Sequence, residues 1–193
     1  MNLRYLFILL CATHIGWAQA DEVLSASTRG ALQHQISDLT SPKLGVASQG
    51  ETDIWLNEMS RRLPKHIPDS KKRTDFLSTV RYEAKRAGLD PQLVLGLIEV
   101  KSGFNQRTVS PTGAQGYMQV MPFWVKAIGN PDHDLFNLRT NLRYGCTILR
   151  HYLDMESGDM YRALGRYDGS LGKLEFPNQV RAAWKNHWGV SSP

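Results

Sequence analysis

The feature that most constrains the fold is the spacing of apolar residues from about residue 70 onward. These side chains recur three, four or seven positions apart, which is the spacing of one face of an α-helix. The pattern predicts helices that end at Gly88 and Gly103, and further helices over residues 123–128, 139–155 and 159–167 and from Pro177 onward. Period-two alternation is not sustained anywhere in the chain. We therefore expect an all-α fold.

The first twenty residues differ from the rest of the chain. Arg4 supplies a positive charge, a short apolar run follows, and Ala18-Gln19-Ala20 fits a small-x-small cleavage site. These are the marks of a secretory signal peptide, and the apolar run is too short to span a bilayer. We expect residues 1–20 to be cleaved before Asp21 and the protein to work in the periplasm or cell envelope. An uncleaved anchor is the alternative.

Residues 21–70 are predicted to be a weakly ordered N-terminal segment with one short helix. Ser, Thr, Gly and Gln are frequent there, and residues 41–50 have the composition of a loop. Residues 53–62 form one amphipathic segment, which Pro64 ends. The remaining residues, 71–190, are long enough for a single domain with its own core.

Charge and cysteine content limit the functional classes. The net charge is +5, and loss of Arg4 with the signal peptide leaves +4, which suits an anionic partner such as the cell wall. Cys146 is the single cysteine after cleavage, so neither an internal disulfide nor a cysteine zinc site is expected. Its helical neighbours Leu142 and Leu149 indicate a buried, inert thiol. We expect no metal, no cofactor and no nucleic acid partner.

An ordered series of motifs carries a family resemblance. Ser102-Gly103-Phe104-Asn105 is followed by a run over residues 110–122, then by Asn141-Leu142-Arg143-Tyr144-Gly145 and by Arg166-Tyr167-Asp168-Gly169. Together these motifs resemble the soluble lytic transglycosylase domain, which shares the goose-type lysozyme fold. The resemblance covers roughly residues 75–188 and implies a lysozyme-like helical domain that acts on peptidoglycan strands.

The resemblance also implies a reaction and a set of site residues. In the family, a Glu directly before the Ser-x-Phe element protonates the bond between N-acetylmuramic acid and N-acetylglucosamine. The same Glu then deprotonates the muramyl C6 hydroxyl, which yields a 1,6-anhydro sugar. By carry-over, Met118, Gln119 and Tyr167 line the glycan groove. We extend the predicted substrate-binding set to Ser110, Tyr117, Tyr144 and Asp168, although Tyr117 and Met118 also fit a core role and Tyr144 fits either.

The sequence departs from the family pattern at two positions. Lys101 stands where the catalytic Glu is expected, and Asp168 stands where relatives have Asn. Glu99 is predicted to face away from the groove, because two residues turn a helix by about 200°. A cation on an apolar face needs a partner, so we hypothesise that Asp168 neutralises Lys101 across the cleft. A turn role before Gly169 is the alternative for Asp168.

Two functions follow from these observations. Under the enzyme hypothesis, the chain is an envelope lytic transglycosylase whose activity is impaired by Lys101. Under the binding hypothesis, it is a non-catalytic protein that holds peptidoglycan strands or a partner from the envelope-assembly machinery. Position 101 discriminates between them, since a permanent cation does not suit a reaction that develops positive charge at the sugar.

Overall fold

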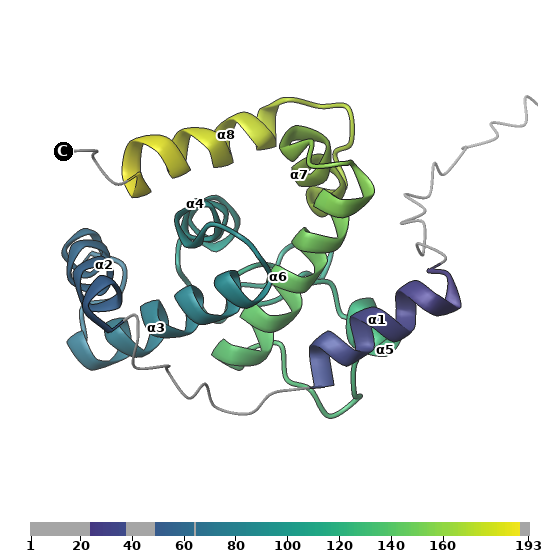
Figure 1. The fold of residues 1–193 in the computed structure, drawn as a ribbon, viewed down its shortest axis with the longest axis horizontal. Coiled ribbons are helices and arrows are strands. Elements are labelled where there is room, and N and C mark those ends of the chain that lie inside the picture. The colour runs from purple at the N-terminus through teal and green to yellow at the C-terminus, as the bar shows by residue number, and fades with distance from the viewer. Residues whose placement is uncertain (1–23, 38–48, 64, 190–193) are drawn as a thin grey trace, which may run out of the picture.

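The computed structural model describes residues 24–37, 49–63 and 65–189, which fold into helices joined by turns (Figure 1). Within these ranges there is no β-strand, only two isolated β-bridges among residues 109–120. The all-α prediction is confirmed. The helices are α1 Ala26–Ser37, α2 Gln49–Arg62, α3 Ser70–Arg86, α4 Pro91–Ser102, α5 Phe123–Ile128, α6 Leu138–Met155, α7 Met160–Asp168, α8 Glu175–Ala183 and a final π-helical turn, η2 Trp184–Trp188.

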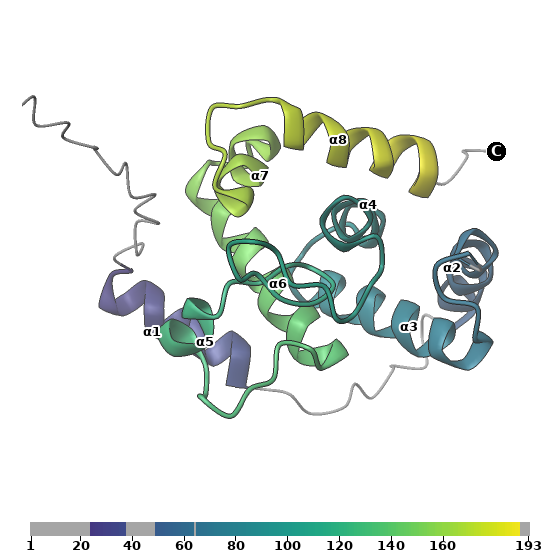
Figure 2. The ribbon, with the colours of Figure 1, turned by 180° about the vertical axis from the view of Figure 1, so that it is seen from behind.

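Helix α4 is the centre of the fold. It is seen nearly end-on in Figures 1 and 2, with α8 on one side and α3 on the other, and it also contacts η2. Its ends follow the predicted signals. Asp90 caps the first turn by accepting a hydrogen bond from the backbone N–H of Gln92, and Pro91 opens the helix. Gly103 ends it in a left-handed conformation, with φ of 55°.

Close packing against α4 depends on a residue without a side chain. A Cβ atom added at Gly96 would lie 2.8 Å from the backbone nitrogen of Trp184, in η2. The seven residues of α4 that are buried include the whole stretch from Leu93 to Ile98. Over this stretch the helix is therefore apolar on every side, as a helix segment buried in a core must be.

The N-terminal part is more ordered than its composition predicts. Residues 26–37, expected to lack regular structure, form α1, which buries Leu32 and Ile36 against α5 and α6. The short helix predicted at 53–62 begins earlier, at Gln49. Tertiary burial explains both differences, because an amphipathic face gains most of its helical stability from packing. The predicted signal peptide and most of the predicted loop at 41–50 lie outside the described residues.

A buried ion cluster joins α3 to α6. Glu83 has no exposed surface, and its carboxylate receives hydrogen bonds from Arg86 at 3.0 Å and from Arg143 at 2.5 and 3.0 Å. Arg139 also contacts it, at 3.4 Å. Arg143 is itself fully buried and donates to the backbone carbonyl of Gln35, in α1. The cluster therefore attaches α1 to the main body.

None of the described helices has the length and apolar composition needed to cross a bilayer. Cys146 is buried in α6 with a free thiol, as the helical spacing predicted. Burial raises the pKa of this thiol well above its usual value, so the group stays protonated and unreactive in the folded protein.

Candidate active site around Lys101

Lys101 lies in the last turn of α4 and faces the C-terminal end of α7. Its ammonium donates a hydrogen bond to Asp168 Oδ1 over 2.9 Å. The two side chains are 17% and 25% exposed, so the pair is largely shielded from water. The hypothesised contact between Lys101 and Asp168 is confirmed.

The ring of Phe176, in α8, completes the surroundings of this ammonium. The Lys101 Nζ atom lies 5.2 Å from the ring centroid, within the range of a cation–π contact. Phe176 is buried at the start of α8. Sequence reasoning did not single it out, because it precedes the predicted start of the last helix at Pro177 and belongs to none of the family motifs.

Glu99 does not reach this position. Its carboxylate lies 2.8 Å from His187 Nδ1 and accepts a hydrogen bond of 2.6 Å from Trp188 Nε1. Both partners belong to η2. Glu99 thus binds different partners from Lys101, as helix geometry predicted, and its carboxylate has a structural role in holding η2.

Two hydroxyl groups fasten the turn at residues 116–119 next to Lys101. Ser102 Oγ donates to the carbonyl of Tyr117 at 2.7 Å, and Tyr167 Oη donates to the carbonyl of Met118 at 3.0 Å. The first hydroxyl comes from α4 and the second from α7. Burial raises the pKa of Tyr167 well above its usual value, so this phenol remains a hydrogen-bond donor.

Asn141 also holds the turn at residues 116–119, through hydrogen bonds from the interior of the protein. Its side chain is fully buried, accepts a hydrogen bond from the Met118 backbone N–H and donates to the carbonyls of Gln115 and Leu135. Gly116 makes this approach possible, because a Cβ atom there would lie 2.4 Å from Asn141 Nδ2. The backbone of the turn is therefore set by side chains that lie inside the protein.

The predicted groove residues fall into two groups. Met118 and Tyr144 have no exposed surface, so in this conformation their side chains cannot contact a bound strand. The Met118 sulfur packs on Gly145, where a Cβ atom would lie 2.3 Å away, and the Tyr144 hydroxyl is 2.8 Å from His133 Nδ1. These two residues support the site from the core.

Tyr117, Gln119 and Ser110 also have internal roles. Tyr117 is 8% exposed and packs against Phe76, with ring centroids 4.9 Å apart. Gln119 has a φ of 54°, and its amide donates to the carbonyls of Thr108 and Gly116. The Ser110 hydroxyl accepts from the backbone of Ala114 and closes a turn. Of the predicted set, the structure brings together Lys101, Tyr167 and Asp168.

Among the described residues, no group of three or more His, Cys, Asp or Glu side chains has the arrangement of a metal site. The cluster of acid–base groups at the candidate site consists of one cation and one carboxylate that already neutralise each other. The site can therefore form hydrogen bonds through the Lys101 ammonium. This group has three N–H donors and uses one of them on Asp168.

The fold and site define an all-α domain in which a paired cation occupies the end of the central helix. The sequence matches the Transglycosylase SLT domain model over residues 78–187, and the chain belongs to this family. Its fold class is therefore the lysozyme-like helical one that the motifs predicted.

Individual relatives match parts of the chain. A transglycosylase of Enterobacteria phage PRD1 is 36% identical over 104 residues, which are 54% of this chain and 38% of the relative. A membrane-bound lytic murein transglycosylase C of Glaesserella parasuis is 41% identical over 115 residues, or 51% and 32% of the two chains. The chain thus spans less than two fifths of the length of either relative.

Two solved structures are also similar. An inactive mutant of the lytic transglycosylase Slt from Pseudomonas aeruginosa has 26% identity and a TM-score of 0.44, over 56% of this chain and 18% of that one. The 70-kDa soluble lytic transglycosylase of Escherichia coli has 16% identity and a TM-score of 0.41, over 86% and 25%.

Proposed function

We propose that this protein binds murein glycan strands at the site around Lys101 and cleaves them very slowly or not at all. The observation that carries the proposal is the 2.9 Å ion pair between Lys101 and Asp168. The resemblance of the flanking motifs implies that Lys101 stands where the family has its catalytic acid. Family membership and the names of the relatives, which are murein transglycosylases, support murein as the ligand.

The ion pair hinders Lys101 from serving as the proton donor that the family reaction needs. If Lys101 gave its proton to a glycosidic oxygen, the pair would break and Asp168 would be left as an unpaired, largely shielded carboxylate. Leaving such a charge without its partner is costly. General acid–base catalysis typically contributes about 10²–10⁴-fold to a rate, and this contribution is absent without the donor.

Electrostatics act in the same direction. A cation about 4 Å from an oxocarbenium-like transition state costs about 4 kcal/mol at an effective dielectric constant of 20. Asp168 offsets part of this cost because it neutralises Lys101. The loss of the acid is therefore the larger effect. The hydrogen bonds of Ser102, Asn141 and Tyr167, which fix the turn beside Lys101, support retained binding of a strand.

The test is to restore the family pair. Purified sacculi are incubated with the native protein, Lys101→Glu, Asp168→Asn and the double variant, and released 1,6-anhydro-muropeptides are measured by liquid chromatography and mass spectrometry. We expect release by the double variant at a rate at least about 100-fold above that of the native protein. The single Lys101→Glu variant should be slower, because its carboxylate would face Asp168 at close range.

The matched control is Lys126→Glu, which makes the same charge change on an exposed residue of α5. Similar release by the native protein and the double variant would contradict the proposal. Release by the native protein that Asp168→Asn abolishes would instead assign the acid role to Asp168. Binding without release, measured by sedimentation with sacculi, is the expected behaviour of the native protein.

The proposal also includes export of the protein to the cell envelope. A strand-binding protein must reach the envelope, and residues 1–20 have the composition of a cleavable signal peptide. Cell fractionation combined with N-terminal sequencing should find the mature protein in the envelope fraction, beginning at Asp21. A mature chain that begins at Met1 would contradict this part of the proposal. A protein partner in envelope assembly remains the alternative ligand, and co-purification from cross-linked envelopes tests it.

A further inference from the structure

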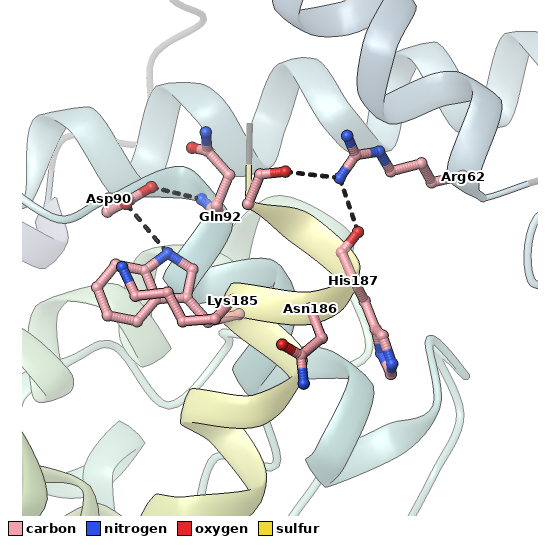
Figure 3. A pocket seen from close by; sticks show the side chains of 8 residues that line it. Arg62, Asp90, Gln92, Lys185, Asn186 and His187 are labelled. Carbon is pink, nitrogen blue, oxygen red and sulfur yellow. Dashed lines mark hydrogen bonds between the residues drawn. The ribbon is translucent and has the colours of Figure 1, made fainter. Parts of the chain in front are cut away.

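The end of α4 opposite to Lys101 is surrounded by two adjoining hollows. One has a volume of about 500 Å³ and lies between α2, the start of α4 and η2 (Figure 3). The other has a volume of about 630 Å³ and lies between α2, α3 and the start of α4. Asp90 and Gln92 line both, so the hollows are neighbours. Lys101 comes ten positions after Pro91 in the helix, which corresponds to a rise of about 15 Å.

The walls of these hollows are basic. Four cations line them, two from each hollow: Arg62, Lys185, Arg81 and Lys85. Asp90 is the only carboxylate in the lining that the structure describes, and both of its oxygens are engaged. Oδ1 accepts from the Gln92 backbone, and Oδ2 accepts from Trp184 Nε1 at 3.1 Å.

Two of the four cations are structural. Arg62 Nη1 donates to the carbonyls of His187 and Gly189, as Figure 3 shows, and its Nη2 donates to Glu58. Arg81 donates to the hydroxyl of Thr52. Both arginines therefore have partners that join α2 to η2 or to α3 and are not available to a ligand without breaking those contacts.

The two lysines are different. Lys85 and Lys185 are exposed, and neither has an acidic partner among the described residues. The Lys185 ammonium rests over the ring of Trp184, 3.9 Å from its centroid. The carboxylate of Asp90 already occupies the N-terminus of α4, so this helix end is not free to bind an anion. The attraction for an anion therefore comes from the two lysine ammonium groups. They stand on either side of the shared residues Asp90 and Gln92.

We propose that Lys85 and Lys185 form a second binding site that takes carboxylate groups of murein stem peptides. The inference rests on the proposed function, since it takes murein as the ligand. Stem peptides carry free carboxylates and project from the glycan strand, and the start of α4 lies about 15 Å along the helix axis from Lys101. The basic lining complements this charge.

The experiment titrates the full chain with the free stem tetrapeptide and follows binding by calorimetry. Charge reversal at Lys85→Glu or Lys185→Glu should weaken the affinity about fivefold each, the upper end of the range for exposed pairs, and the double variant about 25-fold. Binding of the native protein should also weaken in high salt, because exposed charges are screened. The control Lys126→Glu should bind the tetrapeptide as the native protein does.

Sedimentation separates this inference from the proposed function. The double lysine variant should lose affinity for intact sacculi but keep its affinity for glycan strands from which an amidase has removed the peptides. Equal affinity of native and double variant for the tetrapeptide would overturn the inference. Binding to phosphatidylglycerol vesicles in place of the tetrapeptide would overturn it in favour of a lipid surface. Failure to bind peptide-free strands would count against the proposed function, while the tetrapeptide titration still decides the second site.

Discussion

Breaking the Lys101–Asp168 ion pair from either side should lower the stability of the domain. An exposed pair contributes up to about 1 kcal/mol, and removal of one partner of a fully buried pair costs about 3–5 kcal/mol. The two side chains are 17% and 25% exposed, so their pair lies between these limits. We expect Lys101→Met and Asp168→Asn each to lower the free energy of unfolding by about 2 kcal/mol.

The double variant isolates the interaction itself. With both charges removed, no group is left without its partner, and the loss should be smaller than the sum of the two single losses. We expect a coupling energy of about 1–2 kcal/mol, within the range for residues in direct contact. The measurement is urea unfolding followed by far-UV circular dichroism for the native protein and the three variants.

A second ion pair in the same protein serves as the control for this double-mutant cycle. Lys71 and Asp75 form an ion pair with a similar N–O distance, 3.0 Å, but their side chains are 87% and 59% exposed. Their coupling energy should be about 0.3–0.5 kcal/mol and should fall in 1 M salt. A coupling for Lys101 and Asp168 no larger than that of the control pair would refute the view that their ion pair is shielded and holds the site together.

Three further outcomes follow from the packing around the site. Gly145→Ala should lower the free energy of unfolding by about 1–3 kcal/mol, measured by urea unfolding, because its Cβ would lie 2.3 Å from the Met118 sulfur. Gly30→Ala is the control, since nothing lies within 4 Å of its Cβ. Glu83→Gln should cost about 3–5 kcal/mol in the same assay, as it removes the negative charge that balances the buried Arg143. Cys146 should react with a thiol reagent only after unfolding; fast labelling of the native protein would contradict its burial.

Local signals were sufficient for most of the helical framework. Asp90-Pro91 and Gly103 set the ends of α4, and Asp159 caps α7 as predicted. These boundaries depend on backbone groups within one turn of the capping residue, so neighbouring residues specify them. Helix α1 was missed for the opposite reason. Its composition is weakly helical, and its two buried residues gain their stability from α5 and α6.

In the candidate site, too, some features follow from neighbouring residues and others only from tertiary contacts. Helix geometry alone placed Glu99 on the far side from Lys101, because the two residues share one helix. The hypothesis of a contact between Lys101 and Asp168 needed the family motifs to bring distant segments together. The burial of Met118 and Tyr144 was not predictable from motif membership, since a motif marks residues that form a site without separating those that support it from those that touch a ligand.

By itself, then, the sequence determined most of the helices from residue 70 onward and their caps, which depend on short-range geometry and on residue type. Only the tertiary structure decided that Lys101 and Asp168 pair at 2.9 Å, that Glu83 binds the buried Arg143, and that Lys85 and Lys185 line two neighbouring hollows at the other end of α4. The physical reason is that such contacts join residues far apart in the chain. Their distances are fixed only when the packed helices set the separation between them.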